Sequence, residues 1–111
     1  MPVYHGTDED SARSILANGL DQLAWETAAG MAGPDPKGFS VSDSLDIARD
    51  WARWRALERL GDADRGMVLQ ADPDDLPLYQ GQPGHWTDPG ERFVRPEDFP
   101  NVGSAIFQAV P

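Results

Sequence analysis

Residues 3–20 read VYHGTDEDSARSILANGL, and this stretch decides the fold. Residues 2–6 predict a short strand that ends at a glycine, where the backbone can turn tightly. A helix capped by Thr7 or Asp8 follows, with acidic side chains at its positive end and an Asn-Gly pair as its stop signal. The apolar residues of this helix recur on one face: Ala12, Ile15, Leu16 and Leu20.

A second strand and helix follow the same plan further along the chain. Residues 38–42 alternate apolar with small polar side chains, as a strand does. Ser42 or Asp43 is then expected to cap the longest helix, which continues to about Gly61. We expect the two tryptophans of this helix, Trp51 and Trp54, to pack in the core.

The rest of the chain predicts further strands and long connections, without the βαβ alternation of parallel sheets. The fold class is therefore expected to be α+β. Residues 21–37 are expected to form a long loop with a short helix at 23–28, either a lid or a surface loop. Further strands are expected at residues 67–71, 76–79, 92–94 and 104–110.

Length and charge restrict the function. With 111 residues the chain is expected to form one domain over 1–111. Its formal net charge of −10 disfavours nucleic-acid binding, because phosphate neutralisation needs a basic surface. The same charge suits a basic protein partner or simply favours solubility.

The chain contains no cysteine and only two histidines. Disulfides and Cys-ligated zinc are excluded, and a His-rich metal centre is not expected. The N-terminus lacks the basic and apolar segments of a signal peptide, and no apolar run has the length of a membrane span. We therefore expect a cytoplasmic protein without membrane contact.

Three short motifs contain the candidate site residues. His5, Gly6 and Thr7 lie at the junction of a strand and a helix, where an imidazole can hold a sugar hydroxyl or simply serve the structure. In the second motif Gly38 permits close approach, Phe39 can pack or stack, and the hydroxyls of Ser40 and Ser42 share one strand face unless a serine only caps the helix. The third motif places Glu91 at the start of a strand, either beside a ribose or in solvent.

The order of these motifs resembles the His-Tyr-Glu branch of the ADP-ribosyltransferase superfamily. The resemblance covers about residues 3–110 and includes Tyr-His-Gly-Thr, Gly-Phe-Ser-Val-Ser-Asp followed by Ala48 and Trp51, and Gly-Glu-Arg-Phe-Val. It implies two split antiparallel sheets with two main helices, and a cleft between the sheets that binds NAD. The branch includes many bacterial toxin domains.

The resemblance also implies roles for individual residues. His5 would hold the adenosine-side ribose with help from Thr7, and Glu91, or its rival Glu97, would support cleavage of the nicotinamide–ribose bond. The family's stacking tyrosine is replaced by Ser40, which matches the Ser-x-Ser strand of a different toxin branch. The expected catalytic set is His5, Ser40 and Glu91, and the expected cofactor-binding set is His5, Gly6, Thr7, Gly38, Phe39 and Ser42.

The resemblance implies an enzyme that uses NAD as a substrate, either a mono-ADP-ribosyltransferase acting on a protein or small molecule or an NAD glycohydrolase. Ser40 at the stacking position favours an alternative, a catalytically inactive binding module that acts as a sensor or antitoxin. An RNA 2′-phosphotransferase is disfavoured by the acidic chain. Binding anionic NAD would require Arg13, Lys37 or Arg92 near its pyrophosphate.

Overall fold

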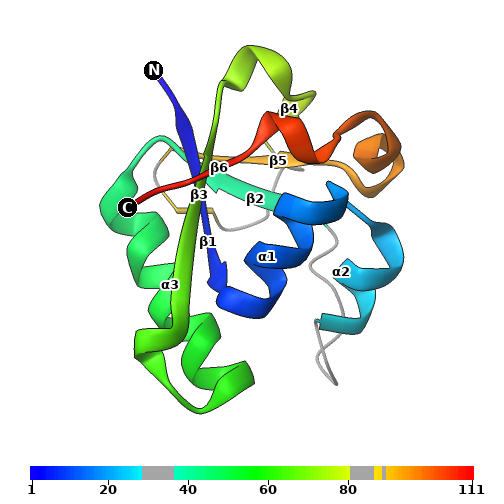
Figure 1. Cartoon of the computed structure of the whole chain (residues 1–111). Helices are drawn as coiled ribbons and strands as arrows, with labels where there is room; N and C mark the ends of the chain where they lie inside the picture. The colour runs from blue at the N-terminus through cyan, green and yellow to red at the C-terminus, as the bar shows by residue number, and fades with distance from the viewer. Residues whose placement is uncertain (29–36, 81–86, 89) are drawn as a thin grey trace.

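The computed structural model describes residues 1–28, 37–80, 87–88 and 90–111 (Figure 1). The loop expected at 21–37 and the residues His85 and Trp86 thus lie partly or wholly outside the described residues. The helices are α1 (Glu9–Asn18), α2 (Gln22–Ala28), α3 (Leu45–Leu60) and the short 3-10 segments η2 (Ala63–Arg65), η3 (Pro73–Asp75), η4 (Pro96–Asn101) and η5 (Ser104–Ile106). The strands are β1 (Val3–Asp8), β2 (Phe39–Ser42), β3 (Gly66–Ala71), β4 (Leu78–Tyr79), β5 (Glu91–Val94) and β6 (Gln108–Ala109).

The described strands form one antiparallel sheet in the order β4-β5-β2-β1-β3-β6. This confirms the α+β class and corrects the expectation of two separate sheets. The sheet is nevertheless almost divided, because the register between β1 and β2 consists of the single pair Tyr4↔Ser42. By contrast, β1 pairs with β3 along its whole length. The two halves are therefore joined at one point.

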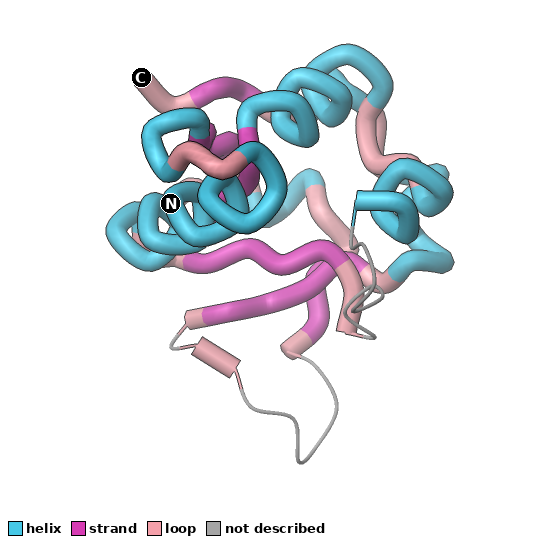
Figure 2. Tube along the Cα trace, turned by 90° about the horizontal axis from the view of Figure 1, so that it is seen from below, coloured by secondary structure: helices cyan, strands magenta, loops and turns pink. Residues whose placement is uncertain are grey.

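Helix α3 lies along β1 and β3 on one face of the sheet (Figure 1). Its buried positions are Ala48, Ala52 and Ala56, spaced by four residues. Small side chains at this spacing allow the helix axis to lie close to the strands, where Gly6 and Gly66 provide the facing surface. The helical segments lie around the strands, which gather toward the middle of the molecule (Figure 2).

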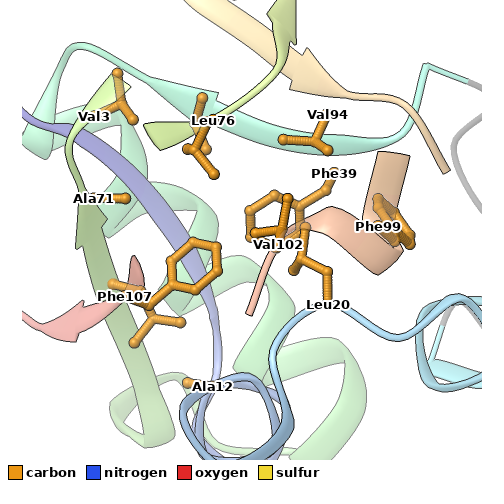
Figure 3. Packing of buried hydrophobic residues seen from close by; sticks show 12 residues of the cluster. Val3, Ala12, Leu20, Phe39, Ala71, Leu76, Val94, Phe99, Val102 and Phe107 are labelled. Carbon is orange, nitrogen blue, oxygen red and sulfur yellow. The ribbon is translucent and has the colours of Figure 1, made fainter. Parts of the chain in front are cut away.

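The main hydrophobic core lies on the other face of the sheet, where α1 and the C-terminal segments cover it (Figure 3). Phe107, which is 5% exposed, reaches this core and meets Phe39 edge-on, with ring centroids 5.7 Å apart. Burying aromatic side chains of this size contributes strongly to stability. The buried members are Val3, Ala12, Leu20, Phe39, Val41, Leu69, Ala71, Leu76, Val94, Phe99, Val102 and Phe107.

The C-terminal strand expected at 104–110 is wrong over most of its length. Residues 104–106 form η5, and only the two residues of β6 pair with β3. The segment before it, η4, was not predicted and contains Pro100, which lacks the N–H that a strand ladder needs. Phe99, Val102 and Phe107 are buried from this irregular backbone, so their hydrophobicity reflects the core and not a strand.

The helix caps agree with the sequence except at the start of α3. Asp8 caps α1 through Ser11 N, and the positive φ angles of Gly19 (75°) and Gly61 (71°) end α1 and α3 as expected. The cap of α3 is Ser44, whose side chain accepts from Ile47 N, and not Ser42 or Asp43. Strand β2 ends at Ser42, as the alternation indicated, and Asp43 lies between the strand and the cap.

We expect Ser44→Ala to lower the free energy of unfolding by about 1 kcal/mol, because the Ile47 amide loses its capping oxygen. Asp43→Ala is the matched control, since its side chain makes a surface ion pair with Arg92 and caps nothing in α3. Its expected effect is below about 0.5 kcal/mol. Urea denaturation of both variants measures the difference, and equal effects would contradict the assignment of Ser44 as the cap.

The expectation that both α3 tryptophans pack in the core is wrong for Trp54, which is 63% exposed. Trp54 lies two residues beyond buried Ala52, which places it on the opposite side of the helix. Trp51 is partly buried, packs on the α3 face of the sheet and donates from Nε1 to Asp88 Oδ2 at 2.9 Å. The alanine stripe, with Trp51 beside it, forms the helix–sheet contact, and Trp54 takes no part in it.

Candidate functional site

A cavity of about 450 Å³ lies where β1 and β2 are no longer paired. Strands β1 and β2, helices α1, α2 and α3, and Phe99 of η4 all contribute to its wall. This volume is in the range of small-molecule sites. The described residues that line it are His5, Thr7, Asp10, Ser11, Ser14, Ile15, Gly19, Leu20, Asp21, Ala24, Trp25, Gly38, Phe39, Ser40, Arg55, Arg59 and Phe99.

His5 is the buried imidazole of this cavity, only 7% exposed. Its Nδ1 lies 2.5 Å from the carbonyl oxygen of Ser40, and its ring stacks on Phe39 with centroids 3.9 Å apart. A carbonyl can only accept, so Nδ1 carries the proton and Nε2 is left as an acceptor. The ring is thereby fixed in position and in tautomer.

The environment of His5 keeps it uncharged. Burial, followed by the nearby positive charge of Arg55, lowers the pKa of His5 from 6.5 to about 3. Arg59 adds to this effect, while the hydrogen bond to Ser40 and the charge of Asp8 oppose it. At neutral pH the site therefore holds a neutral imidazole that can accept a hydroxyl proton in a hydrogen bond.

Thr7 belongs to a polar cluster next to His5, in which Thr7 and Asp8 are buried and Arg59 reaches the surface. Its Oγ1 donates to Asp8 Oδ1 at 3.2 Å and accepts from Arg59 Nη1 at 3.1 Å. Arg59 Nη1 also contacts Asp8 Oδ1 at 2.9 Å. Burial would raise the pKa of Asp8, but hydrogen bonds from Arg59 and Ser11 outweigh it and lower that pKa. Asp8 thus remains ionised and fixes the guanidinium beside the cavity.

Arg55 crosses the gap between the two halves of the sheet. Its Nη1 donates to the Gly6 carbonyl on β1, and its Nη2 donates to Ser40 Oγ on β2 at 3.2 Å. Side-chain hydrogen bonds from Arg55 and His5 thus connect the strands beyond their single backbone pair. This explains how a nearly divided sheet keeps a fixed separation at the cavity.

The sequence did not single out Arg55 and Arg59 as site residues. Four residues apart in α3, they lie one helical turn from each other, and that spacing was the only available signal. The three cations that were expected do not line the cavity. Arg13 is exposed beside Glu9, Lys37 lies over the Phe93 ring, and Arg92 pairs with Asp43.

The fold itself explains the glycines at positions 6 and 38, which were predicted to bind the cofactor. A side chain at Gly6 would overlap the Ala48 carbonyl of α3, and Gly6 is not among the residues that line the cavity. Gly38 lines the cavity with a φ of 110°, a conformation that other residues rarely adopt. Close packing against α3 therefore requires Gly6, whereas the turn into β2 requires Gly38.

The two serines of β2 do not act together. Ser40 lines the cavity and accepts from Arg55, while Ser42 is fully buried and accepts from the Ser44 amide at 3.1 Å. Phe39 also lines the cavity, where its ring supports His5. Phe39 and Ser40 both contact His5, because the Phe39 ring stacks on the imidazole and the Ser40 carbonyl accepts from Nδ1.

Glu91 is not brought to His5. It pairs with Ser42 in the register of β2 and β5, and Ser42 in turn pairs with Tyr4, at the point where the sheet halves join. Its carboxylate accepts from the Asp88 amide at 2.8 Å. The rival Glu97 lies in η4 with its side chain 75% exposed. Neither glutamate is among the cavity-lining residues that the structure describes.

The α2 side of the cavity is aromatic. Trp25 and Phe99 meet edge to face with ring centroids 5.4 Å apart, and both line the cavity. Tyr79 and Phe93 contact each other with ring centroids 6.1 Å apart, and neither lines the cavity. Trp25 is the aromatic residue that the sequence left without a role.

Among the described residues, no group of His, Asp or Glu is arranged to hold a metal ion. None of the described helices is both long and apolar enough to cross a bilayer. Comparisons with protein-family models, curated proteins and solved structures each find no significant match to this chain. The geometry of the cavity is therefore the basis for a functional proposal.

Proposed function

We propose that the cavity binds NAD and that the protein cleaves the nicotinamide–ribose bond, as a mono-ADP-ribosyltransferase or an NAD glycohydrolase. The observation that supports this most strongly is the neutral, buried His5, fixed by Ser40 and Phe39 in a cavity that also contains two arginines. A fixed acceptor beside a cationic wall suits a ligand that carries both ribose hydroxyls and phosphates.

The reaction breaks the bond between the ribose anomeric carbon and the nicotinamide nitrogen. Nicotinamide leaves with the bonding electrons, and water or an acceptor nucleophile adds to the anomeric carbon and loses a proton. Positive charge develops at that carbon, so a nearby carboxylate lowers the barrier. Glu91 is the proposed carboxylate from the motif order, and in this structure it lies at the joined end of the sheet.

That position favours a second candidate, an NAD-binding module without turnover. His5 and Thr7 line the cavity, whereas Glu91 is held by the Asp88 amide outside it. In such a protein His5, Thr7 and the arginines would retain the ligand, and no group would stabilise the developing charge. The two candidates share one binding site and differ only in chemistry.

Nicotinamide release by the full chain, with and without a cell lysate as the source of acceptor, separates the candidates. We expect release by the wild type and a loss of about 100-fold or more in both His5→Ala and Glu91→Gln. Glu97→Gln is the matched control and should keep full activity, since its side chain is exposed. Circular dichroism of each variant checks that it is folded.

Calorimetric titration with NAD completes the test. Saturable binding without release, abolished in His5→Ala, would support the binding module. Neither binding nor release by the folded wild type would contradict both candidates. Release that survives Glu91→Gln but not Glu97→Gln would transfer the catalytic role to Glu97.

A further inference from the structure

We infer that Arg55 and Arg59 form the anion-binding end of the cavity and hold the phosphate groups of its ligand. This inference rests on the proposed function and adds to it the residues that recognise the charged part of the substrate. The two side chains come from α3, an element outside the three motifs that suggested NAD, and both line the cavity.

The hydrogen bonds of the two arginines fix their orientation before a ligand arrives. Arg55 is held by Gly6 and Ser40 on opposite sides of the sheet gap. Arg59 is held by Thr7 and Asp8, and within the described residues both of these bonds come from Nη1. Its Nη2 is therefore the group that would meet a phosphate oxygen. Pre-oriented guanidinium groups recognise phosphate better than flexible cations do.

The electrostatics of the cavity agree with this assignment. Although the chain carries a net charge of −10, the charges of Arg55 and Arg59 add to burial in lowering the pKa of His5, and the charge of Asp8 opposes them. Among the carboxylates near this end, Asp8 is paired with Arg59, and Asp10 lies within 3.9 Å of Arg65. The remaining lining carboxylate, Asp21, belongs to the α2 side with Trp25.

Binding of ADP and adenosine to the wild-type protein tests this inference with defined probes. The two molecules share the base and ribose, and only ADP carries phosphates. We expect ADP to bind about tenfold or more tightly than adenosine, and inorganic pyrophosphate to compete with ADP but not with adenosine. Equal affinity for ADP and adenosine would overturn the inference.

Substitutions of the two arginines test whether they cause the preference for ADP over adenosine. Arg55→Gln and Arg59→Gln should each reduce the preference for ADP by about tenfold while leaving adenosine affinity nearly unchanged. Arg53→Gln is the matched control, an exposed arginine of α3 that does not line the cavity. An ADP preference that survives both substitutions would also overturn the inference.

If Arg59→Gln fails to fold because Asp8 loses its partner, a second type of variant tests the inference without removing an arginine. Ser14→Asp adds a negative charge to the cavity wall and should weaken ADP but not adenosine, and Ser14→Asn is its neutral control. If ADP binding is unaffected by Ser14→Asp, the inference fails.

The results also distinguish this inference from the proposed function. NAD turnover without any ADP preference refutes the anion-binding end alone. An ADP preference that depends on the arginines, without NAD binding, refutes the proposed function alone.

Discussion

Replacement of Gly6 by alanine is expected to lower the free energy of unfolding by at least about 3 kcal/mol, and thus to remove much of the stability of a domain of this size. An added Cβ would overlap the backbone carbonyl of Ala48 and crowd the Ala52 amide. Neither atom can rotate away, because both belong to the α3 backbone. Helix α3 must move off β1, and its arginines must leave the cavity with it. Thermal and urea denaturation measure the loss.

Gly103→Ala is the control for this substitution. A Cβ at Gly103 meets no atom within 4 Å, and its φ of −81° suits any residue. We expect a change within about 0.5 kcal/mol of zero at this position. If Gly6→Ala were as stable as Gly103→Ala, the close contact between α3 and β1 would be wrong.

Acidification is expected to destabilise the protein through His5, beginning at a higher pH than the protonation of carboxylates. The unfolded histidine has a pKa of 6.5 and the folded one a pKa of about 3. Between these values the unfolded chain binds the proton and the folded chain does not, so the free energy of unfolding falls as the pH falls below 6.5. The loss is about 2.7 kcal/mol at pH 4.5, about 0.4 kcal/mol at pH 6.5 and negligible at pH 7.5.

A measurement at pH 4.5 lies above the pH range in which Asp8 loses its contribution to stability. The pKa of Asp8 is lowered from 3.8, so its stabilisation is present at pH 4.5 and is lost only at lower pH. His5→Asn is the informative variant, because its amide nitrogen can still donate to Ser40 but does not titrate. Urea midpoints at pH 7.5 and 4.5 should differ less in this variant than in the wild type. An equal pH dependence would show that His5 is not buried in its neutral form.

The N-terminal half of the fold was predictable because its signals are local. Capping by Asp8, the stop at Gly19 and the apolar face of α1 depend on residues within a few positions of one another. The strand that contains His5 and the second strand with its long helix follow for the same reason. These elements supply His5, Thr7 and Ser40 to the cavity.

The C-terminal half was less predictable because its hydrophobic residues serve a distant core. Phe99 is buried from η4, which was not predicted, and Phe107 is buried from the turn after η5, within the run 104–110 that was expected to be a strand. Burial is satisfied by any backbone that carries these rings to the core. Hydrophobicity without a regular period therefore did not indicate the secondary structure of this segment.

The sequence by itself determined the α+β class, the strand–helix unit around His5 and the side chains available for chemistry, since each follows from neighbours along the chain. Only the tertiary structure decided which of them meet. The rotation of α3 turned Arg55 and Arg59 toward the cavity and left Trp54 in solvent. The register of β2 and β5 placed Glu91 at the joined end of the sheet, away from His5. Helix rotation and strand register depend on contacts between residues far apart in the chain, which no local pattern encodes.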